Sequence, residues 1–308
     1  MPNLAQSGSG GGERLRGHCL CGEVHYEASG PAGDMWYCHC RECGKASGVG
    51  FGTWIEAPGV RWLSGDERVV RRTTSPTLTR AFCSQCGTVL PALHAGNGGA
   101  LLPAGGLENV GRLRPSGHAC ASERLPWLPV FDESLSVLHK SCDPASQGRT
   151  SRERASLARA ASPERATGAP VRGSCLCGTV AWEVEPPLLA MRVCHCSRCR
   201  RRSGSNGFVG VMTRSGTLRL LHGATEITSW HMPGTRFYSV SFCKSCGSPA
   251  PSTIPKGSFV SAGCLDDDPG TRTQCHVFYG SRAAWVDAKD DLPRFEEFPP
   301  PDYDWSQP

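Results

Sequence analysis

Fourteen of the eighteen cysteines in this chain belong to one pattern that occurs twice. Each copy contains a C-x-C pair, then a C-H-C-x-x-C run, then a C-x-x-C-G pair. The first copy comprises Cys19, Cys21, Cys38, Cys40, Cys43, Cys83 and Cys86, and the second comprises Cys175, Cys177, Cys194, Cys196, Cys199, Cys243 and Cys246. The first five cysteines are offset by 156 residues between the copies, and the last two by 160. Chance does not maintain such a register, so the sequence indicates a tandem duplication of a metal-binding unit.

The bulk properties of the chain narrow its class. A length of 308 residues suits two domains, and no run of eighteen apolar residues is present, so we expect no membrane span. The N-terminus lacks a basic segment followed by an apolar one, which argues against secretion. Eighteen cysteines could form a secreted disulfide scaffold, but C-x-x-C pairs without a signal peptide are more typical of metal sites in a reducing compartment. We therefore predict a cytoplasmic protein. A net charge of +5 without a basic, aromatic-rich face does not favour nucleic-acid binding.

Composition and short apolar runs divide the chain into five segments. We predict a disordered tail (1–14), a first zinc domain (15–140), a linker (141–170), a second zinc domain (171–299) and a C-terminal tail (300–308). Short strands are predicted at 23–27, 51–55, 79–82, 179–184, 208–212 and 237–242. No long helical periodicity occurs outside the linker, so both domains are predicted to be mainly β.

Each copy contains two cysteine pairs, C-x-C and C-x-x-C, which we call clamps and which can together form a metal site. C-x-C and C-x-x-C each present two thiols on one turn, and two such clamps complete the tetrahedron that structural zinc prefers. The predicted structural sites are Cys19, Cys21, Cys83 and Cys86 in the first domain, and Cys175, Cys177, Cys243 and Cys246 in the second. A glycine follows each clamp, as expected where the backbone turns toward sulfur.

The remaining C-H-C-x-x-C runs offer three thiols each. A zinc site with three protein ligands keeps one position open, which is typical of catalytic sites. Either His39 or His195 could instead supply a fourth ligand and close the site. However, neighbouring residues on an extended strand point to opposite sides, so a histidine between two metal-facing cysteines should point away.

Three thiolates around Zn²⁺ favour sulfur chemistry. They leave a net charge of −1 and weaken the Lewis acidity of the ion, so a soft fourth ligand such as a substrate thiol fits better than hard oxygen chemistry. A thiol bound to zinc loses its proton and becomes a nucleophile or, in reverse, a leaving group. This chemistry indicates an enzyme that makes or breaks a carbon–sulfur bond.

Both copies contain G-x-C-x-C-G-x-V, C-H-C-x-x-C with a following S-G, F-C-x-x-C-G and G-x-L-(D/E)-(D/N). Together these motifs resemble the glutathione-dependent formaldehyde-activating enzyme (GFA) family, also called the centromere protein V/GFA domain. The resemblance covers both domains and implies β-tent-like folds with one structural and one exchangeable zinc each, four per chain. It also implies carbon–sulfur lyase-type chemistry on a thiol adduct such as S-hydroxymethylglutathione, made from formaldehyde and glutathione. By the family pattern, the catalytic zinc ligands would be Cys38, Cys40, Cys43, Cys194, Cys196 and Cys199.

Some positions depart from the family pattern. The segment Leu265-Asp266-Asp267 matches it, whereas the first copy has Leu107-Glu108-Asn109, so the second domain is the closer match. We expect the two aspartates to cap a turn. Lys45, Arg200 and Arg201 could bind substrate carboxylates or neutralise the zinc–thiolate charge.

Cys120, Cys142, Cys264 and Cys275 lie outside the repeat, and we expect them to be small buried residues. Two functional alternatives remain. One is a zinc-stabilised binding module without catalysis, in which a fourth protein ligand closes each three-cysteine site. The other is thiol redox chemistry through the C-x-x-C pairs.

Overall fold

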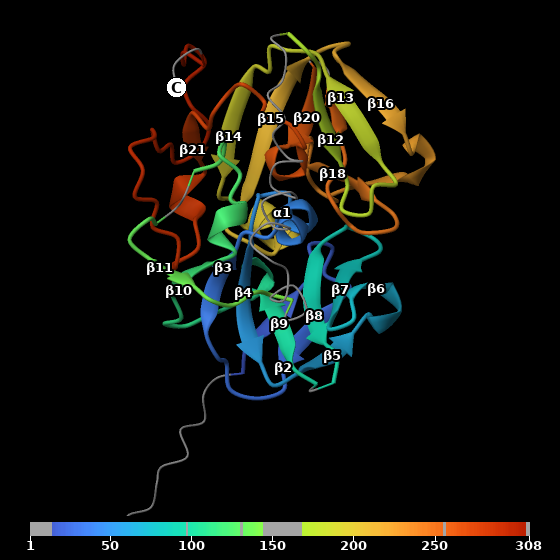
Figure 1. Ribbon diagram of the computed structural model, residues 1–308, viewed down its shortest axis with the longest axis vertical. Coiled ribbons are helices and arrows are strands. Elements are labelled where there is room, and N and C mark those ends of the chain that lie inside the picture. Colours follow the sequence, from blue (N-terminus) through green and yellow to red (C-terminus); the bar gives the residue numbers. More distant parts are fainter. Residues whose placement is uncertain (1–13, 97, 130–131, 144–167, 255–256, 306–308) are drawn as a thin grey trace, which may run out of the picture.

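The computed structural model describes residues 14–96, 98–129, 132–143, 168–254 and 257–305, and it folds the chain into two β-rich halves that lie against each other (Figure 1). The predicted N-terminal tail up to residue 13, the linker from 144 to 167 and the last three residues of the C-terminal tail lie outside the described residues. Within the described part, the mainly β, two-domain fold predicted from the sequence is confirmed.

The first half is built from three antiparallel strands beside a larger mixed sheet. The small sheet has the order β1-β2-β5, and the large one β11-β10-β3-β4-β9-β8-β7-β6. The strands are β1 (Arg16–His18), β2 (His25–Ala28), β3 (Met35–Cys38), β4 (Gly52–Ala57), β5 (Val60–Ser64), β6 (Val69–Ser75), β7 (Leu78–Cys83), β8 (Val89–His94), β9 (Ala100–Pro103), β10 (Pro115–Ala119) and β11 (Ser136–Leu138). The helical segments are α1 (Arg41–Ser47), η1 (Asp66–Arg68), η2 (Ala104–Gly106) and η3 (Ala121–Glu123).

The second half repeats this plan with two differences, one of which is that a single bridge between His276 and Arg294 takes the place of the β10–β11 pairing. Its sheets have the orders β12-β13-β16, β19-β20-β15-β14-β21 and β17-β18, so the hairpin equivalent to β6-β7 forms a separate sheet. The strands are β12 (Val171–Ser174), β13 (Ala181–Val184), β14 (Ala190–Cys194), β15 (Phe208–Arg214), β16 (Leu218–His222), β17 (Ile227–His231), β18 (Ser239–Cys243), β19 (Ser252–Ile254), β20 (Gly257–Ser261) and β21 (Cys275–Val277). The helical segments are α3 (Ser197–Ser203), η5 (Ala224–Glu226), η6 (Ala262–Cys264) and η7 (Tyr279–Ser281).

Each predicted strand corresponds to an observed one. They are β2, β4, β7, β13, β15 and β18. The strand β13 shows the cause, because Trp182 and Val184 are fully buried while the alternating residues Ala181 and Glu183 are not. The short helices α1 and α3 were not predicted. Each begins where a cysteine side chain accepts a backbone N–H and ends at a left-handed glycine, Gly48 or Gly204.

One hydrophobic core runs through both halves. Tyr26 and Ile55 of the first half belong to the same contiguous cluster of buried side chains as Trp182 and Met191 of the second. Trp127 extends across the boundary and donates its indole N–H to the carbonyl oxygen of Ala262 at 3.1 Å. The two halves therefore stabilise each other by shared burial of apolar surface.

The halves dock through a reciprocal contact between glycine-containing turns and the helices. The Gly263 N–H donates to the Gly48 carbonyl at the end of α1, and the Gly105 N–H donates to the Gly204 carbonyl at the end of α3, both at 3.1 Å. A Cβ at Gly105 would lie 2.3 Å from the Ser205 carbonyl oxygen, and one at Gly263 would lie 2.3 Å from a backbone nitrogen. Glycine is therefore required at both positions, because the two backbones touch.

A buried ion pair reinforces one side of this contact. The Lys45 ammonium group, on α1, lies 2.9 Å from Asp266 of the second half and donates to the carbonyl oxygens of Ser174 (2.7 Å) and Cys264 (3.2 Å). Asp266 also pairs with Arg41 at 2.8 Å. Lys45 thus joins the two halves and is used neither for a substrate carboxylate nor for thiolate neutralisation.

Asp266 and Asp267, which the sequence predicts to cap a turn, form ion pairs in the structure. Asp266 binds Lys45, and Asp267 binds both the guanidinium and the backbone N–H of Arg172 at 2.9 Å. In the first half the turn-capping role does occur at Asn109, whose side chain accepts the N–H of Gly111. The same motif therefore caps a turn in the first half, whereas in the second half it forms ion pairs.

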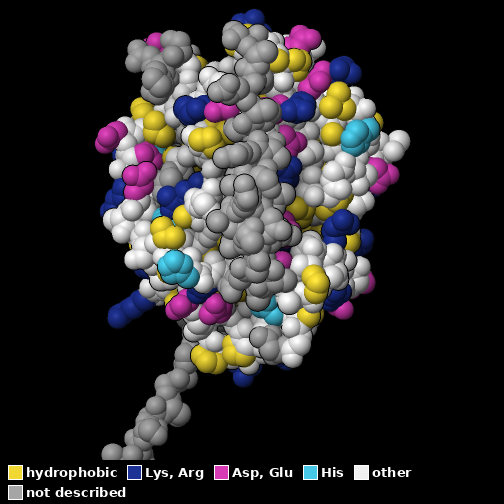
Figure 2. Space-filling view, viewed as in Figure 1, with side chains coloured by type: hydrophobic (Ala, Val, Ile, Leu, Met, Phe, Trp, Pro, Cys, Tyr) yellow, Lys and Arg dark blue, Asp and Glu magenta, His cyan; other side chains and the backbone are white. Residues whose placement is uncertain are grey.

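One face of the molecule has a mixed charge pattern where its residues are described. Basic and acidic side chains are interspersed over the face shown in Figure 2. Among the described helices, none is long and apolar enough to cross a bilayer.

The buried pair generates a stability prediction. Asp266→Ala leaves the Lys45 side chain, which is 4% exposed, without its carboxylate, so we expect the free energy of unfolding to fall by about 3 kcal/mol. Asp287→Ala is the matched control, because its pair with Lys289 is exposed and should contribute below about 1 kcal/mol. Urea unfolding at saturating zinc measures both, and equal losses would contradict the prediction.

Candidate metal centres and active site

Four groups of cysteine sulfur atoms converge in the structure, two in each half. The atoms of each group lie within 4.8 Å of one another, close enough to hold a metal ion. The groups are Cys19, Cys21, Cys83 and Cys86; Cys38, Cys40, Cys43 and Cys142; Cys175, Cys177, Cys243 and Cys246; and Cys194, Cys196 and Cys199. All eighteen cysteines lie in the described residues and none forms a disulfide.

The paired clamps form four-sulfur groups of the same design in both halves. The Val24 N–H donates to Cys19 Sγ, and the Val180 N–H donates to Cys175 Sγ, both at 3.3 Å. The glycine after each clamp has a positive φ between 66° and 81°, as the tight turn requires. Donors aimed at sulfur, together with four convergent thiols, fit a tetrahedral thiolate site.

The C-H-C-x-x-C runs begin at a strand and continue into a helix. Cys38 ends β3 and Cys194 ends β14, while Cys40 and Cys196 cap α1 and α3. The cap sulfurs accept the N–H of the cysteine three residues later, at 3.4 Å for Cys40 and 3.5 Å for Cys196. This strand-to-helix turn brings the three sulfurs of each run together.

The histidine between the cysteines points away from the sulfurs in both halves. His39 Nε2 lies 2.9 Å from His118 Nδ1, and His195 Nε2 lies 2.8 Å from His276 Nδ1. Burial lowers the pKa of His39 and of His195 to about 3, so both imidazoles are neutral. Each histidine therefore braces the strand against its neighbour and leaves the metal position to sulfur.

The two histidine pairs end on different acceptors. His276 Nε2 lies 3.0 Å from a carboxylate oxygen of Asp290, whereas His118 Nε2 lies 2.7 Å from the backbone carbonyl of Asp132. Buried histidines in a β domain are commonly hydrogen-bonded to backbone or side-chain acceptors in this way. The contacts of His118 and His276 are those of structural residues, one layer behind the sulfurs.

Cys142 completes the second sulfur group of the first half. We expected a small buried residue in the linker, but its sulfur lies 3.3 Å from Cys43 Sγ and 3.6 Å from Cys40 Sγ. It has no counterpart in the repeat, so periodicity gave no signal for it. The uneven count of seven thiols per copy was the one indication that an extra cysteine could join. The first-half group is therefore closed by a fourth protein sulfur.

Arg80 and Trp54 enclose this closed group. The Arg80 guanidinium donates to Cys43 Sγ at 3.4 Å and to Cys142 Sγ at 3.3 Å, and the Trp54 indole N–H donates to Cys43 Sγ at 3.2 Å. Burial opposes the charge on Arg80, but the Cys43 and Cys142 sulfurs outweigh burial and raise its pKa. A buried arginine balances the negative charge that four thiolates would leave on a divalent ion.

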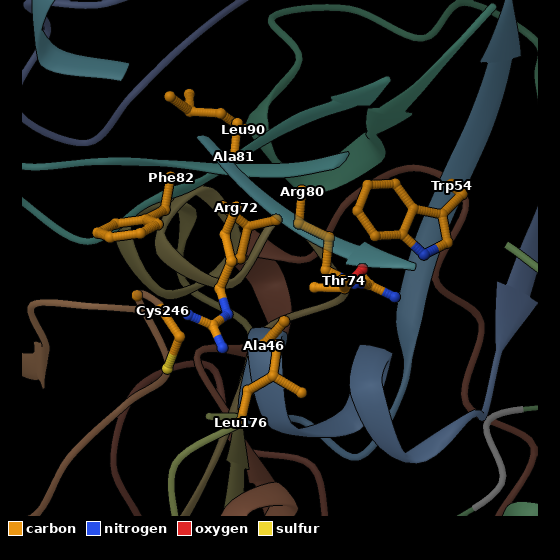
Figure 3. Close-up of a pocket in the computed structure, with 12 residues that line it drawn as sticks. Ala46, Trp54, Arg72, Thr74, Arg80, Ala81, Phe82, Leu90, Leu176 and Cys246 are labelled. Atoms are coloured by element: carbon orange, nitrogen blue, oxygen red, sulfur yellow. The ribbon is translucent and has the colours of Figure 1, made fainter. Parts of the chain in front are cut away.

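A small cavity adjoins the two residues that enclose the closed group. A cavity of about 20 Å³ lies between Trp54, Arg80 and the second-half residues Leu176 and Cys246 (Figure 3). Figure 3 shows the Arg80 and Trp54 side chains converging beside α1, and the guanidinium carbon lies 5.9 Å from the indole centre. This volume holds about one water molecule and no thiol substrate.

The second-half group lacks each of these enclosing features. Strand register pairs Trp36 with Trp54 in the first half and Arg192 with Gly210 in the second, so a glycine replaces the indole donor. The Phe208 ring covers this glycine, because an added Cβ would lie 2.8 Å from it. An apolar ring therefore stands where the first half places a hydrogen-bond donor.

The counterpart of Arg80 is Val240, because each lies three residues before the first cysteine of its C-x-x-C pair. Within the described residues, no fourth ligand atom joins Cys194, Cys196 and Cys199. These three cysteines are partly exposed, whereas their first-half counterparts are buried. The second half thus has a three-sulfur group with an accessible side.

The remaining contacts of this group tune its sulfurs. Hydrogen bonds from Cys194 and Cys199 lower the pKa of the Cys196 thiol to about 3. The Tyr238 hydroxyl hydrogen-bonds to Cys199, and the Arg198 guanidinium lies 5.6 Å from the Tyr238 ring centre. Arg200 donates to the carbonyl oxygens of His195 and Ser281. These residues position the turn and supply hydrogen bonds to sulfur.

A larger hollow of about 620 Å³ lies elsewhere between the halves. Arg114 and Asp132 of the first half and Arg282 and Trp285 of the second line it, and no cysteine does.

Comparison with known proteins agrees with the repeated motifs. The family described as glutathione-dependent formaldehyde-activating enzyme matches residues 14–123 and 170–281. A protein of Halomonas elongata, whose name describes it as a candidate glutathione-dependent formaldehyde-activating enzyme, is 28% identical over 131 residues, which are 38% of this chain and 80% of that protein. A solved structure of a Rhodobacter sphaeroides protein is 30% identical and covers 30% of this chain and 86% of that one, with a TM-score of 0.25. The family match in both halves shows that the chain belongs to the glutathione-dependent formaldehyde-activating enzyme family, with the domain present twice.

Proposed function

We propose that this chain is a zinc-dependent carbon–sulfur lyase-type enzyme with one active site, at Cys194, Cys196 and Cys199. Its substrate would be a thiol adduct, with S-hydroxymethylglutathione as the leading candidate. The observation that carries the proposal is the accessible three-sulfur group of the second half, beside three groups that four protein sulfurs close. Eighteen free cysteines suit a reducing compartment, which supports a cytoplasmic location.

The sulfur donors fit zinc. Thiolates are common ligands of tetrahedral zinc, and four such groups would hold four ions per chain, two in each half. At the three-sulfur group, zinc would supply a fourth coordination position that lowers the pKa of an entering sulfhydryl.

The chain's own residues prepare that position. The Cys199 N–H and the Tyr238 hydroxyl donate to the sulfurs, which reduces the negative charge they place on the ion. In the forward reaction the substrate sulfur bonds to the aldehyde carbon, the S–H bond breaks and the proton ends on the aldehyde oxygen. The reverse reaction breaks the same carbon–sulfur bond. No oxidant or reductant is required in either direction.

We assign Cys38, Cys40 and Cys43 to a closed structural site, in place of the catalytic role expected from the family pattern. Cys142 fills the fourth position, and Arg80 contacts two of the four sulfurs. The alternative function, a zinc-stabilised module without catalysis, required a fourth protein ligand at each three-cysteine site. That description suits the first half and does not suit the second.

Metal release tests the division between closed and open sites. We expect four zinc ions per chain, one of which a mild chromophoric chelator removes rapidly. Cys142→Ala should make a second ion rapidly removable, because it opens the buried first-half site. Cys275→Ala is the matched control, since Cys275 is a buried cysteine of β21 that belongs to none of the four metal groups. Two rapidly released ions in the unmodified protein would contradict the assignment.

Ligand substitution tests where the chemistry occurs. Cys196→Ser should lower turnover by more than about 100-fold while the unfolding midpoint changes little, because the partly exposed site adds little to the fold. Cys177→Ser, in the closed clamp of the same half, should lower the unfolding midpoint markedly. Turnover is measured as formaldehyde–glutathione adduct exchange by NMR against the uncatalysed control. No acceleration with any tested thiol would remove the enzyme proposal.

A further inference from the structure

Arg192 stands next to the open three-sulfur group. It lies on β14 two residues before Cys194, so both side chains project from the same face of the strand. Its position in the first half is taken by Trp36, which is 1% exposed and covered by the Lys140 ammonium group, 3.9 Å from the ring centre. In the second half, beside the partly exposed sulfur group, the cationic Arg192 therefore takes the place of the buried Trp36 indole.

Three aromatic rings surround the Arg192 guanidinium. Its carbon lies 5.2 Å from the ring centre of Phe259, 5.3 Å from that of Phe298 and 5.9 Å from that of Trp305. Phe298 and Trp305 lie at and beyond the end of the second domain as predicted from the sequence. The rings hold the guanidinium in a partly desolvated position, where a charge-assisted hydrogen bond is stronger than in water.

The guanidinium has donors to spare. Among the described residues, its side-chain acceptor is the weak Met212 Sδ at 3.8 Å, and no carboxylate lies within ion-pair distance. The C-terminal segment does not depend on Arg192 for its position, because the Tyr303 hydroxyl donates to the Gln274 carbonyl and the Gln274 amide contacts the Trp305 carbonyl.

We propose that Arg192 binds a carboxylate of the thiol substrate and so selects carboxylate-bearing thiols for the open site. This inference deepens the proposed function and rests on it. A planar guanidinium presents two parallel N–H donors to a carboxylate, and the aromatic rings provide apolar walls for the substrate backbone. Glutathione, with two carboxylates, belongs to this class, whereas 2-mercaptoethanol does not.

Binding measured apart from turnover tests the role of Arg192. With the zinc-loaded full chain, isothermal titration of S-methylglutathione, which has carboxylates but no free thiol, should give a Kd at least about tenfold higher for Arg192→Gln than for the unmodified protein. Arg192→Lys should recover part of the affinity because it keeps the charge. Arg214→Gln, an exposed arginine at the end of β15, is the matched control and should bind normally.

The kinetic prediction concerns substrate choice. Arg192→Gln should raise KM for glutathione about tenfold or more and leave KM for 2-mercaptoethanol nearly unchanged. An equal rise for both thiols, unchanged S-methylglutathione binding by Arg192→Gln, or no binding by the unmodified protein would overturn the inference. If the unmodified protein binds S-methylglutathione through Arg192 but accelerates no adduct exchange, the proposed reaction fails and the carboxylate site stands.

Discussion

Convergent sulfur is the constraint on which the structure depends. In each of four groups the thiol sulfurs lie within 4.8 Å of one another, and ionised sulfurs this close repel one another unless a cation lies between them. The clamps join distant strands of each half, so metal binding and folding would be one process. The strands are only three to seven residues long, so metal binding would add to the stability that burial of their apolar faces provides.

Duplication allowed the two halves to diverge around the same turn. In the first half, Cys142, Arg80 and Trp54 close the sulfur group, balance its charge and exclude solvent. In the second half, Val240 and Gly210 occupy the corresponding places, and the sulfurs are partly exposed. An extra ligand stabilises a metal site and removes its vacant position, so one half cannot maximise both properties.

The sequence predicted features that repeat or that act locally. Strand positions followed from alternation, and the sulfur groups followed from spacing, as did the outward orientation of His39. The place of Cys142 in a sulfur group was not predicted, because this cysteine has no counterpart in the second copy. The helix α1 was not predicted, because seven residues are too few to show a helical periodicity. The ion pair of Asp266 was not predicted for another reason. Its partner Lys45 lies 221 residues away in sequence, and only the docking of the two halves brings the two side chains together.

That docking links the closed site to the open one. The first-half turn at Gly105 binds the carbonyl at the end of α3, the helix that carries Cys199, and no side chain larger than hydrogen fits at the crossing. The position of α3 is therefore set partly by the first half, whose own helix α1 is held rigid by four buried sulfurs and by Lys45. An open metal site needs its three ligands fixed, because the missing fourth ligand no longer orients them. A closed first half would supply that rigidity from outside the site, so a domain without a vacant position would still contribute to the proposed reaction of its neighbour.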